Sequence, residues 1–273
     1  MSIIPGGEMN SIIKKLFLSI VCFLLFSLGF LYGKDVVLKE VVDTYELTSG
    51  RIKLVVRKAG IQYYPGYVSV FLNNGVLFHT FLTGCSSSKE GDRYGRFDKV
   101  NVVSVEPSDI EGGKKIVIKR EYHKGDEALE EITEFALYQE ILSVKTKFIP
   151  KTQVHIGIIS SSFLIPDALL SGTIGIVEKG KEKIEVPFPL SSDKGRLYSG
   201  DGDKLYFTTN NGYKINMSIF KDSPILMVID DARIPNASYP KGVPFFGWGF
   251  EKGIGILEKD KEIKFGIEIE IKQ

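Results

Sequence analysis

Three histidines are the residues of this sequence best suited to proton transfer: His79, His123 and His155. A histidine transfers protons near neutral pH when a partner group holds its ring in place, because its ordinary pKa lies close to that range. We take His155 as a candidate catalytic residue, with an ordinary strand position as the alternative. His79 alternates with apolar residues, so an ordinary strand position accounts for it. His123 precedes Lys124 at a strand end, so a turn position accounts for it.

The segment around Trp248 is a candidate ligand-binding surface. Gly247 and Gly249 flank this tryptophan, and in an extended strand Phe246, Trp248 and Phe250 project from one face. An exposed tryptophan between glycines suits the C–H face of a sugar ring, so Trp248 is a candidate ligand-binding residue. The alternative is a core tryptophan, since large aromatic side chains bury much apolar area.

Two charged residues near Trp248 are further candidates for catalysis. Arg233 precedes the loop Pro235–Pro244, and Glu251 follows the tryptophan strand. Carboxylates held at a defined separation act as acid and base on glycosidic bonds. Arg233 and Glu251 are therefore candidate catalytic residues, and surface ion pairing is the alternative for both.

No residue pattern predicts a metal, a cofactor or a cysteine nucleophile. Three histidines and two cysteines are too few for a zinc cluster. The stretch Ser199–Lys204 lacks the spacing and terminal glutamate of a calcium loop, so we interpret it as a hairpin tip. Cys85 lies in the polar stretch Gly84–Gly95, which we expect to be a loop, without a recognisable protease pattern.

Short strands are expected to position these residues. Period-two alternation recurs after Asp35 and gives roughly fifteen to eighteen strands, with no sustained 3.6-residue stripe that would indicate a helix. Turns at Asn73-Asn74-Gly75 and Asn211-Gly212 join strands into hairpins, and Pro107 falls in an expected loop. The sequence thus predicts an all-β, large antiparallel β-sandwich. Two smaller sandwiches divided near Pro150 are the alternative.

Composition limits the class of protein. The 273 residues include 35 basic and 34 acidic side chains, which give a formal charge of +1. A hydrophobic content of 43% suits a folded chain with a sizeable core. The absence of a basic excess argues against nucleic acid as a partner.

The N-terminus has the features of an export signal. Lys14 and Lys15 precede an apolar run from Leu16 to Tyr32, as in a secretory signal peptide. The run is also just long enough for an uncleaved membrane anchor helix, in which case residues 14–33 alone would contact the membrane. We expect residues 1–33 to direct export and residues 34–273 to form a single β-sandwich domain in the periplasm, outside the cell, or anchored facing outward.

The strand pattern resembles that of the galactose mutarotase-like β-supersandwich superfamily, which includes aldose epimerases and domains of glycoside hydrolases and polysaccharide lyases. The resembling segments cover most of residues 44–271. The His-Thr-Tyr-Phe-like segment that supplies the epimerase general acid is absent, so the resemblance assigns no catalytic residue. The segments that carry the resemblance are Leu47–Leu54, Ile132–Phe135, Leu142–Phe148, Asp230–Arg233 and Gly247–Phe250.

Together these features predict an exported carbohydrate-binding or carbohydrate-active protein, with a polysaccharide or oligosaccharide as partner. A non-catalytic envelope or interaction protein is one alternative. An enzyme resembling polysaccharide lyases or glycoside hydrolases is another, and whether the chain is an enzyme stays open. Binding of a polysaccharide panel separates the first two, and release of new reducing ends or unsaturated products identifies the third.

Overall fold

Two antiparallel β-sheets of nine strands each account for most of the chain after Val36. The computed structural model describes residues 36–58, 68–91, 95–192, 195–221, 226–235 and 242–273. The expected signal or anchor, residues 1–33, lies outside the described residues. Within those ranges no helix has the length and apolar character needed to cross a membrane.

The strand count expected from the sequence is confirmed, with eighteen strands in the described residues. The helix described beside them is the four-residue α2 (Asp167–Leu170). Sheet I contains, in spatial order, β1 (Val37–Val41), β2 (Thr44–Ser49), β3 (Ile52–Arg57), β4 (Val68–Leu72), β5 (Gly75–Ser87), β10 (Val154–Pro166), β17 (Phe245–Leu257), β16 (Leu226–Asp231) and β13 (Arg196–Gly200).

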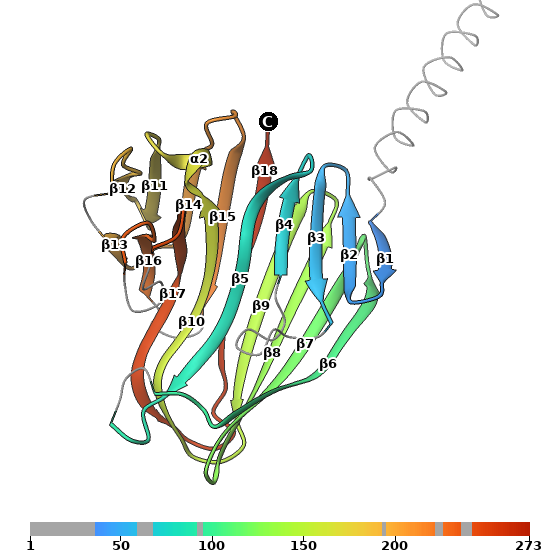
Figure 1. The fold of residues 1–273 in the computed structure, drawn as a ribbon, viewed down its shortest axis with the longest axis vertical. Helices are drawn as coiled ribbons and strands as arrows, with labels where there is room; N and C mark the ends of the chain where they lie inside the picture. Colours follow the sequence, from blue (N-terminus) through green and yellow to red (C-terminus); the bar gives the residue numbers. More distant parts are fainter. Residues whose placement is uncertain (1–35, 59–67, 92–94, 193–194, 222–225, 236–241) are drawn as a thin grey trace, which may run out of the picture. The chain divides into compact units, whose positions relative to one another are not determined.

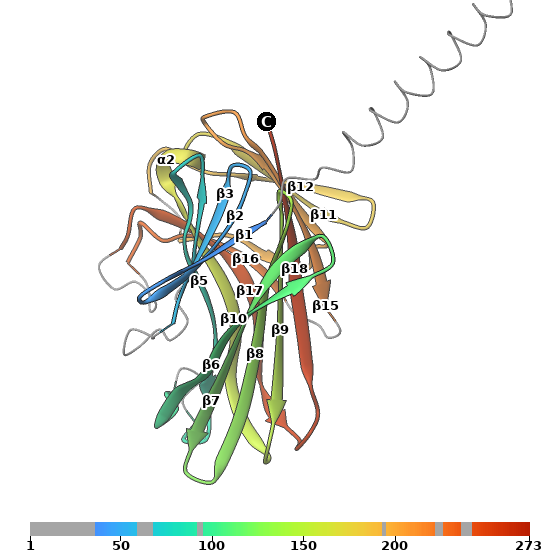
Figure 2. The same ribbon diagram turned by 90° about the vertical axis from the view of Figure 1, so that its right-hand side faces the viewer.

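Sheet II is built from the remaining strands, and its centre lies at β18 and β9. Figure 1 shows the long strands β5, β10 and β17 of sheet I side by side, and Figure 2 shows β8, β9 and β18 of sheet II side by side. Sheet II contains, in spatial order, β12 (Glu182–Pro187), β11 (Ile174–Lys179), β14 (Lys204–Thr208), β15 (Lys214–Lys221), β18 (Ile263–Lys272), β9 (Ile141–Pro150), β8 (Glu127–Tyr138), β7 (Gly113–Lys124) and β6 (Lys99–Ile110).

Both sheets draw strands from both halves of the chain. In sheet I, β10 lies between β5 and β17, and in sheet II the last strand, β18, pairs with β9. Two modules divided near Pro150 would each need sheets of their own. The observed strand pairing does not fit that alternative. Residues 36–273 accordingly form one unit.

Turn chemistry explains how the hairpins close. In the β4–β5 hairpin, Asn73 and Asn74 take positive φ angles of 49° and 66°, so these two residues, and not Gly75, supply the left-handed conformation. Asparagine tolerates this conformation better than most residues. At the Asn211-Gly212 turn the glycine takes it instead, with a φ of 86°.

Three local expectations were wrong. Pro107 lies within β6 and not in a loop, which is tolerated because β6 is the edge strand of sheet II and needs no hydrogen bond from that side. The segment Ser199–Lys204 is not a hairpin tip, because it joins β13 of sheet I to β14 of sheet II. The stretch from Gly84 to Ser87 continues β5 instead of opening a loop.

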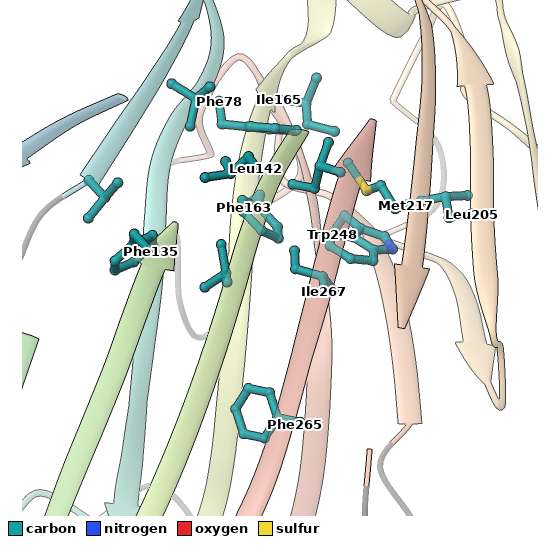
Figure 3. Close-up of a cluster of buried hydrophobic side chains, with 14 of the residues drawn as sticks. Phe78, Phe135, Leu142, Phe163, Ile165, Leu205, Met217, Trp248, Phe265 and Ile267 are labelled. Atoms are coloured by element: carbon teal, nitrogen blue, oxygen red, sulfur yellow. The ribbon is translucent and has the colours of Figure 1, made fainter. Parts of the chain in front are cut away.

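Apolar side chains from the inner faces of the two sheets fill the space between them. Figure 3 shows Phe135 and Ile267 of sheet II together with Phe163 and Trp248 of sheet I in one cluster. The rings of Phe163 and Trp248 stack with their centroids 5.2 Å apart. Burial of such rings removes large apolar areas from water and is the main source of stability in a sandwich of this kind.

A charged pair is also buried between the sheets. Arg120 of β7 donates to a carboxylate oxygen of Glu131 on β8, and the side chains are 6% and 0% exposed. Tyr122 donates to the other oxygen at 2.5 Å, and the hydroxyl of Thr133 adds a hydrogen bond at 2.7 Å. The carboxylate therefore has partners for both oxygens, as a buried charge requires.

Replacing Glu131 with glutamine should destabilise the protein by about 3–5 kcal/mol, because the change leaves the Arg120 charge buried without compensation. The measurement is the free energy of unfolding in urea. Glu134→Gln is the matched control, since Glu134 lies on the same strand and pairs with Lys115 at 2.6 Å on the outer face. That control should lose no more than about 1 kcal/mol, and equal losses in the two variants would contradict the prediction.

Candidate functional site

Trp248 is a core residue and not an exposed sugar platform. Its side chain is 2% exposed and stacks on Phe163 between the sheets (Figure 3). Of the two interpretations of Trp248, the core tryptophan fits the structure and the candidate ligand-binding surface does not, since no ring face is left open to solvent. The reason is strand parity: Phe246 and Trp248 share the inner face of β17, and Phe246 is also fully buried.

Arg233 anchors chain segments near the end of β16. Its guanidinium forms a two-point ion pair with Asp231, at 2.7 and 2.8 Å, and lies 4.6 Å over the ring of Phe246. It also donates to the backbone oxygens of Pro189 and Leu190, at 2.8 and 3.2 Å. The hydrogen bond with Asp231 raises the pKa of Arg233 against the opposing effect of burial.

These contacts use the guanidinium donors to hold segments of the protein together. Arg233 therefore has the contacts of a residue that anchors chain segments, and it lies beside the buried carboxylate of Asp231. Part of the loop that follows Arg233, residues 236–241, lies outside the described residues. Glu251 lies in β17, opposite Ser160 of β10 and Leu226 of β16, and its side chain is likewise outside the described part.

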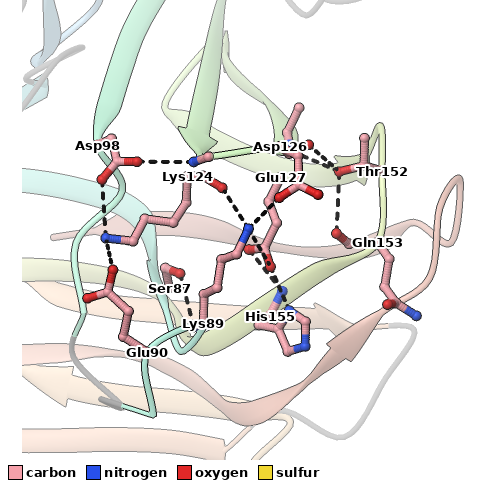
Figure 4. Close-up of polar contacts among 12 residues, drawn as sticks. Ser87, Lys89, Glu90, Asp98, Lys124, Asp126, Glu127, Thr152, Gln153 and His155 are labelled. Carbon is pink, nitrogen blue, oxygen red and sulfur yellow. Dashed lines mark hydrogen bonds and ion pairs between the residues drawn. The ribbon is translucent and has the colours of Figure 1, made fainter.

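His155 has the partner that a catalytic histidine needs. Its Nδ1 lies 2.6 Å from Oε1 of Glu127, and its backbone N–H donates to Oε2 of the same carboxylate at 3.3 Å. Glu127 is 4% exposed, whereas the histidine side chain is 40% exposed. Figure 4 shows this pair where the start of β8 approaches the start of β10.

Lysines and acids surround the His155–Glu127 pair. Lys89 forms an ion pair with Asp126 and lies 4.0 Å from Glu127, while Lys124 contacts Asp98 at 3.1 Å (Figure 4). The hydrogen bond from the backbone of Gly125 lowers the pKa of Asp98, and the bond from Lys124 lowers it further. This network ties the β5–β6 connection to the β7–β8 turn.

The His155–Glu127 pair can hold one tautomer of the ring. A carboxylate only accepts hydrogen bonds, so in neutral His155 the proton lies on Nδ1 and leaves Nε2 as an acceptor. Such a nitrogen can act as a general base if a substrate places a proton within reach. His155 does not line the groove found among the described residues of sheet II, so its catalytic role stays a prediction.

That groove lies on the outer face of sheet II. It has a volume of about 360 Å³, within the range of about 300–1,000 Å³ that small-molecule sites occupy. Four neighbouring strands, β8, β9, β18 and β15, form its floor. Its outward side chains are Ile132 and Glu134 of β8, Lys145 and Lys147 of β9, Lys264 of β18, and Phe220 of β15.

Strand register explains why these distant residues meet. Glu134 is paired with Lys145, Lys145 with Gly266, and Gly266 with Phe220, so four strands contribute one continuous row. Gly266 leaves a gap in this row, because glycine has no side chain. A Cβ atom there would come within 2.6 Å of the backbone oxygen of Val144 and 3.2 Å of Cγ of Lys145.

The groove combines one aromatic ring with paired charges. Phe220 is 46% exposed, so part of its ring is open to solvent. Glu262 lies 2.6 Å from Lys264 and 3.5 Å from Lys147. The hydrogen bond with Lys264 lowers the pKa of Glu262, so this carboxylate stays ionised at neutral pH and is unsuited to donate a proton.

The sequence analysis did not identify Glu127 or the groove, although the alternation of side chains between the two faces of a strand gave a signal for each. Glu127 and Glu131 share one face of β8 with Leu129 and Phe135, so two acids stand among core positions. In β15, Phe220 falls on the face opposite the buried Ile215 and Met217. Polar residues on an inner face and an aromatic residue on an outer face both depart from strand patterning.

The surroundings of Cys85 do not favour a nucleophilic thiol. Burial raises the pKa of its thiol, and the negative charge of Glu131 raises it further, with only partial relief from Arg120. A protonated thiol is a poor nucleophile. Within the described residues, no group of three or more acidic, histidine or cysteine side chains could hold a metal ion.

Comparison with solved structures identifies the fold. A protein from Escherichia coli K12 with the provisional name aldose 1-epimerase aligns with 84% of this chain and 98% of its own, at 14% identity and a TM-score of 0.56. Heparinase III aligns over 88% of this chain and 37% of its own, at 12% identity and a TM-score of 0.53. A glycoside hydrolase family 97 enzyme from Pseudoalteromonas sp. strain K8, in complex with acarbose, covers 83% of this chain at 11% identity and a TM-score of 0.52, over 35% of its own length.

These similarities confirm the mutarotase-like all-β fold that the strand pattern predicted. At such low identities the likeness concerns the fold alone, because one fold serves many functions. No family model matches the sequence, and no curated protein matches it. Function therefore has to be argued from the residues of the chain itself.

Trp248→Ala should destabilise the protein by about 3–5 kcal/mol, because the change removes a fully buried ring and leaves a cavity. Urea unfolding measures the loss. Leu226→Ala is the control on the neighbouring strand β16, since its side chain is 47% exposed. The control should stay within about 0.5 kcal/mol of the parent. A loss below about 1 kcal/mol in Trp248→Ala would show that the ring does not support the core.

Proposed function

We propose that this protein is an exported carbohydrate-binding protein and that the sugar binds in the groove on the outer face of sheet II. The observation that carries the proposal is the exposed ring of Phe220, which borders a groove of small-molecule size lined by charged side chains. A sugar places its C–H face on an aromatic ring and its hydroxyls against charged groups. Phe220 and the lysines beside it offer both kinds of contact.

The carbohydrate-active proteins that share the fold support this proposal. Heparinase III and the family 97 glycoside hydrolase are named for action on carbohydrate chains, and the latter was solved with acarbose bound. Glu262 stays ionised at neutral pH because its pKa is lowered, and Glu134 is engaged in an ion pair with Lys115. Binding is therefore the function that the groove supports best.

Phe220→Ala should weaken oligosaccharide binding by about tenfold, because loss of ring stacking costs roughly 1 kcal/mol or slightly more. The measurement is isothermal titration calorimetry of the full chain with a panel of neutral and acidic oligosaccharides. Ile174→Ala is the matched control, since Ile174 is a 54% exposed apolar residue of β11 in the same sheet.

The panel also tests for turnover. New reducing ends or unsaturated products would assign an enzymatic activity in place of simple binding, and His155→Ala would then be the first variant to assay. Absence of binding to every member of the panel would contradict the proposed function.

The export part of the proposal rests on the N-terminal segment. Expressed in a bacterium with its own N-terminus, the protein should leave the cytoplasm and become about 3 kDa lighter if the signal is cleaved, at roughly 110 Da per residue. Mass spectrometry of the periplasmic and membrane fractions measures both. An uncleaved anchor would appear at full mass in the membrane fraction, and full-length soluble protein in the cytoplasm would contradict export.

A further inference from the structure

Four lysines and two glutamates crowd the outer face of sheet II around the groove. Lys115 pairs with Glu134 at 2.6 Å, and Lys147 and Lys264 both pair with Glu262. Within this set of six side chains, positive charge exceeds negative charge. A ligand of opposite charge would be attracted to it.

Of these four lysines, Lys145 is the one that has no carboxylate within ion-pair distance among the described residues. It lies between Glu134, whose carboxylate is paired with Lys115, and Gly266, which has no side chain. Its side chain is exposed, and Cγ lies close to the Gly266 backbone. The ammonium group is thus available to a ligand in the groove.

Distance sets how a ligand could reach both Lys145 and Phe220. The two residues lie in the same row of the sheet, two strands apart, with Gly266 between them. Adjacent strands are about 4.8 Å apart, so the two positions are separated by about 10 Å. A sugar ring that bears a charged substituent spans a distance of this order, with its ring on Phe220 and its charge toward Lys145.

We propose that the sugar bound in this groove is anionic and that its carboxylate or sulfate pairs with Lys145. This inference rests on the proposed function, because it specifies the ligand of the same groove. Lys147 and Lys264 strengthen the attraction from the adjacent row, where they are paired directly with each other in the strand register. Ion pairing at a partly exposed site weakens as salt is added.

The test compares oligosaccharides that differ only in charge. A glucuronate-containing disaccharide, its sulfated counterpart and its carboxyl-reduced neutral form are titrated into the full chain by calorimetry at low and high salt. We expect the anionic forms to bind about tenfold more tightly than the neutral form at low salt, as a charge-assisted hydrogen bond provides. The carboxylate and sulfate forms identify which anion the groove prefers.

Lys145→Gln should remove the preference for the anionic forms over the neutral form. Lys145→Arg should retain the preference. Lys183→Gln is the control, since Lys183 is an exposed lysine of β12 in the same sheet that pairs with Glu178 at 3.0 Å. Thermal unfolding of each variant checks that the fold is retained.

The outcomes separate this inference from the proposed function. Equal binding of neutral and anionic forms, with loss in Phe220→Ala, would overturn the inference and keep the proposed function. An anionic preference that survives in Lys145→Gln would also overturn the assignment to Lys145. Failure of all three sugars to bind would overturn the proposed function and the inference with it.

Discussion

Burial of alternate side chains between two nine-stranded sheets is the constraint on which the rest of this structure depends. The central strands give alternate residues to the interior, where Phe163, Trp248 and their neighbours exclude water (Figure 3). The protein has one free cysteine in the described residues, so no covalent link contributes there. Apolar area must therefore supply most of the stability, which explains why the sheets are long and why large aromatic residues lie at their centre.

Several polar side chains inside the sandwich form hydrogen bonds with one another. Arg120, Tyr122, Thr133 and Glu131 form a hydrogen-bonded cluster on β7 and β8. Glu127 is equally buried but lies nearer the end of β8, where its partner His155 reaches solvent. The same strand thus holds two buried carboxylates in different situations. Glu131 is enclosed by structural partners, whereas Glu127 is connected through a histidine to the surface.

Local patterns predicted the elements of the fold, and pairing between distant segments determined the site. Alternation and turn residues were enough to predict the strand content and the hairpin at Asn73-Asn74, because both depend on neighbouring residues. The contact of Glu127 with His155 depends on how the β7–β8 turn meets the start of β10, which no local pattern encodes. The groove requires β15, β18, β9 and β8 to align in one register. For Trp248 the local pattern was ambiguous, because its flanking glycines fitted both a core position and an exposed one.

The same constraint leaves the outer faces free to vary. In β9 and β18, Thr146 and Phe265 face the interior while Lys145 and Lys264 face the groove. A change at Lys145 removes no buried contact, so selection can alter the charge of this face without a cost in core packing. Gly266 is the exception, because a side chain there would collide with the backbone of β9. The groove therefore combines a floor that is fixed by sheet geometry with walls that are open to substitution.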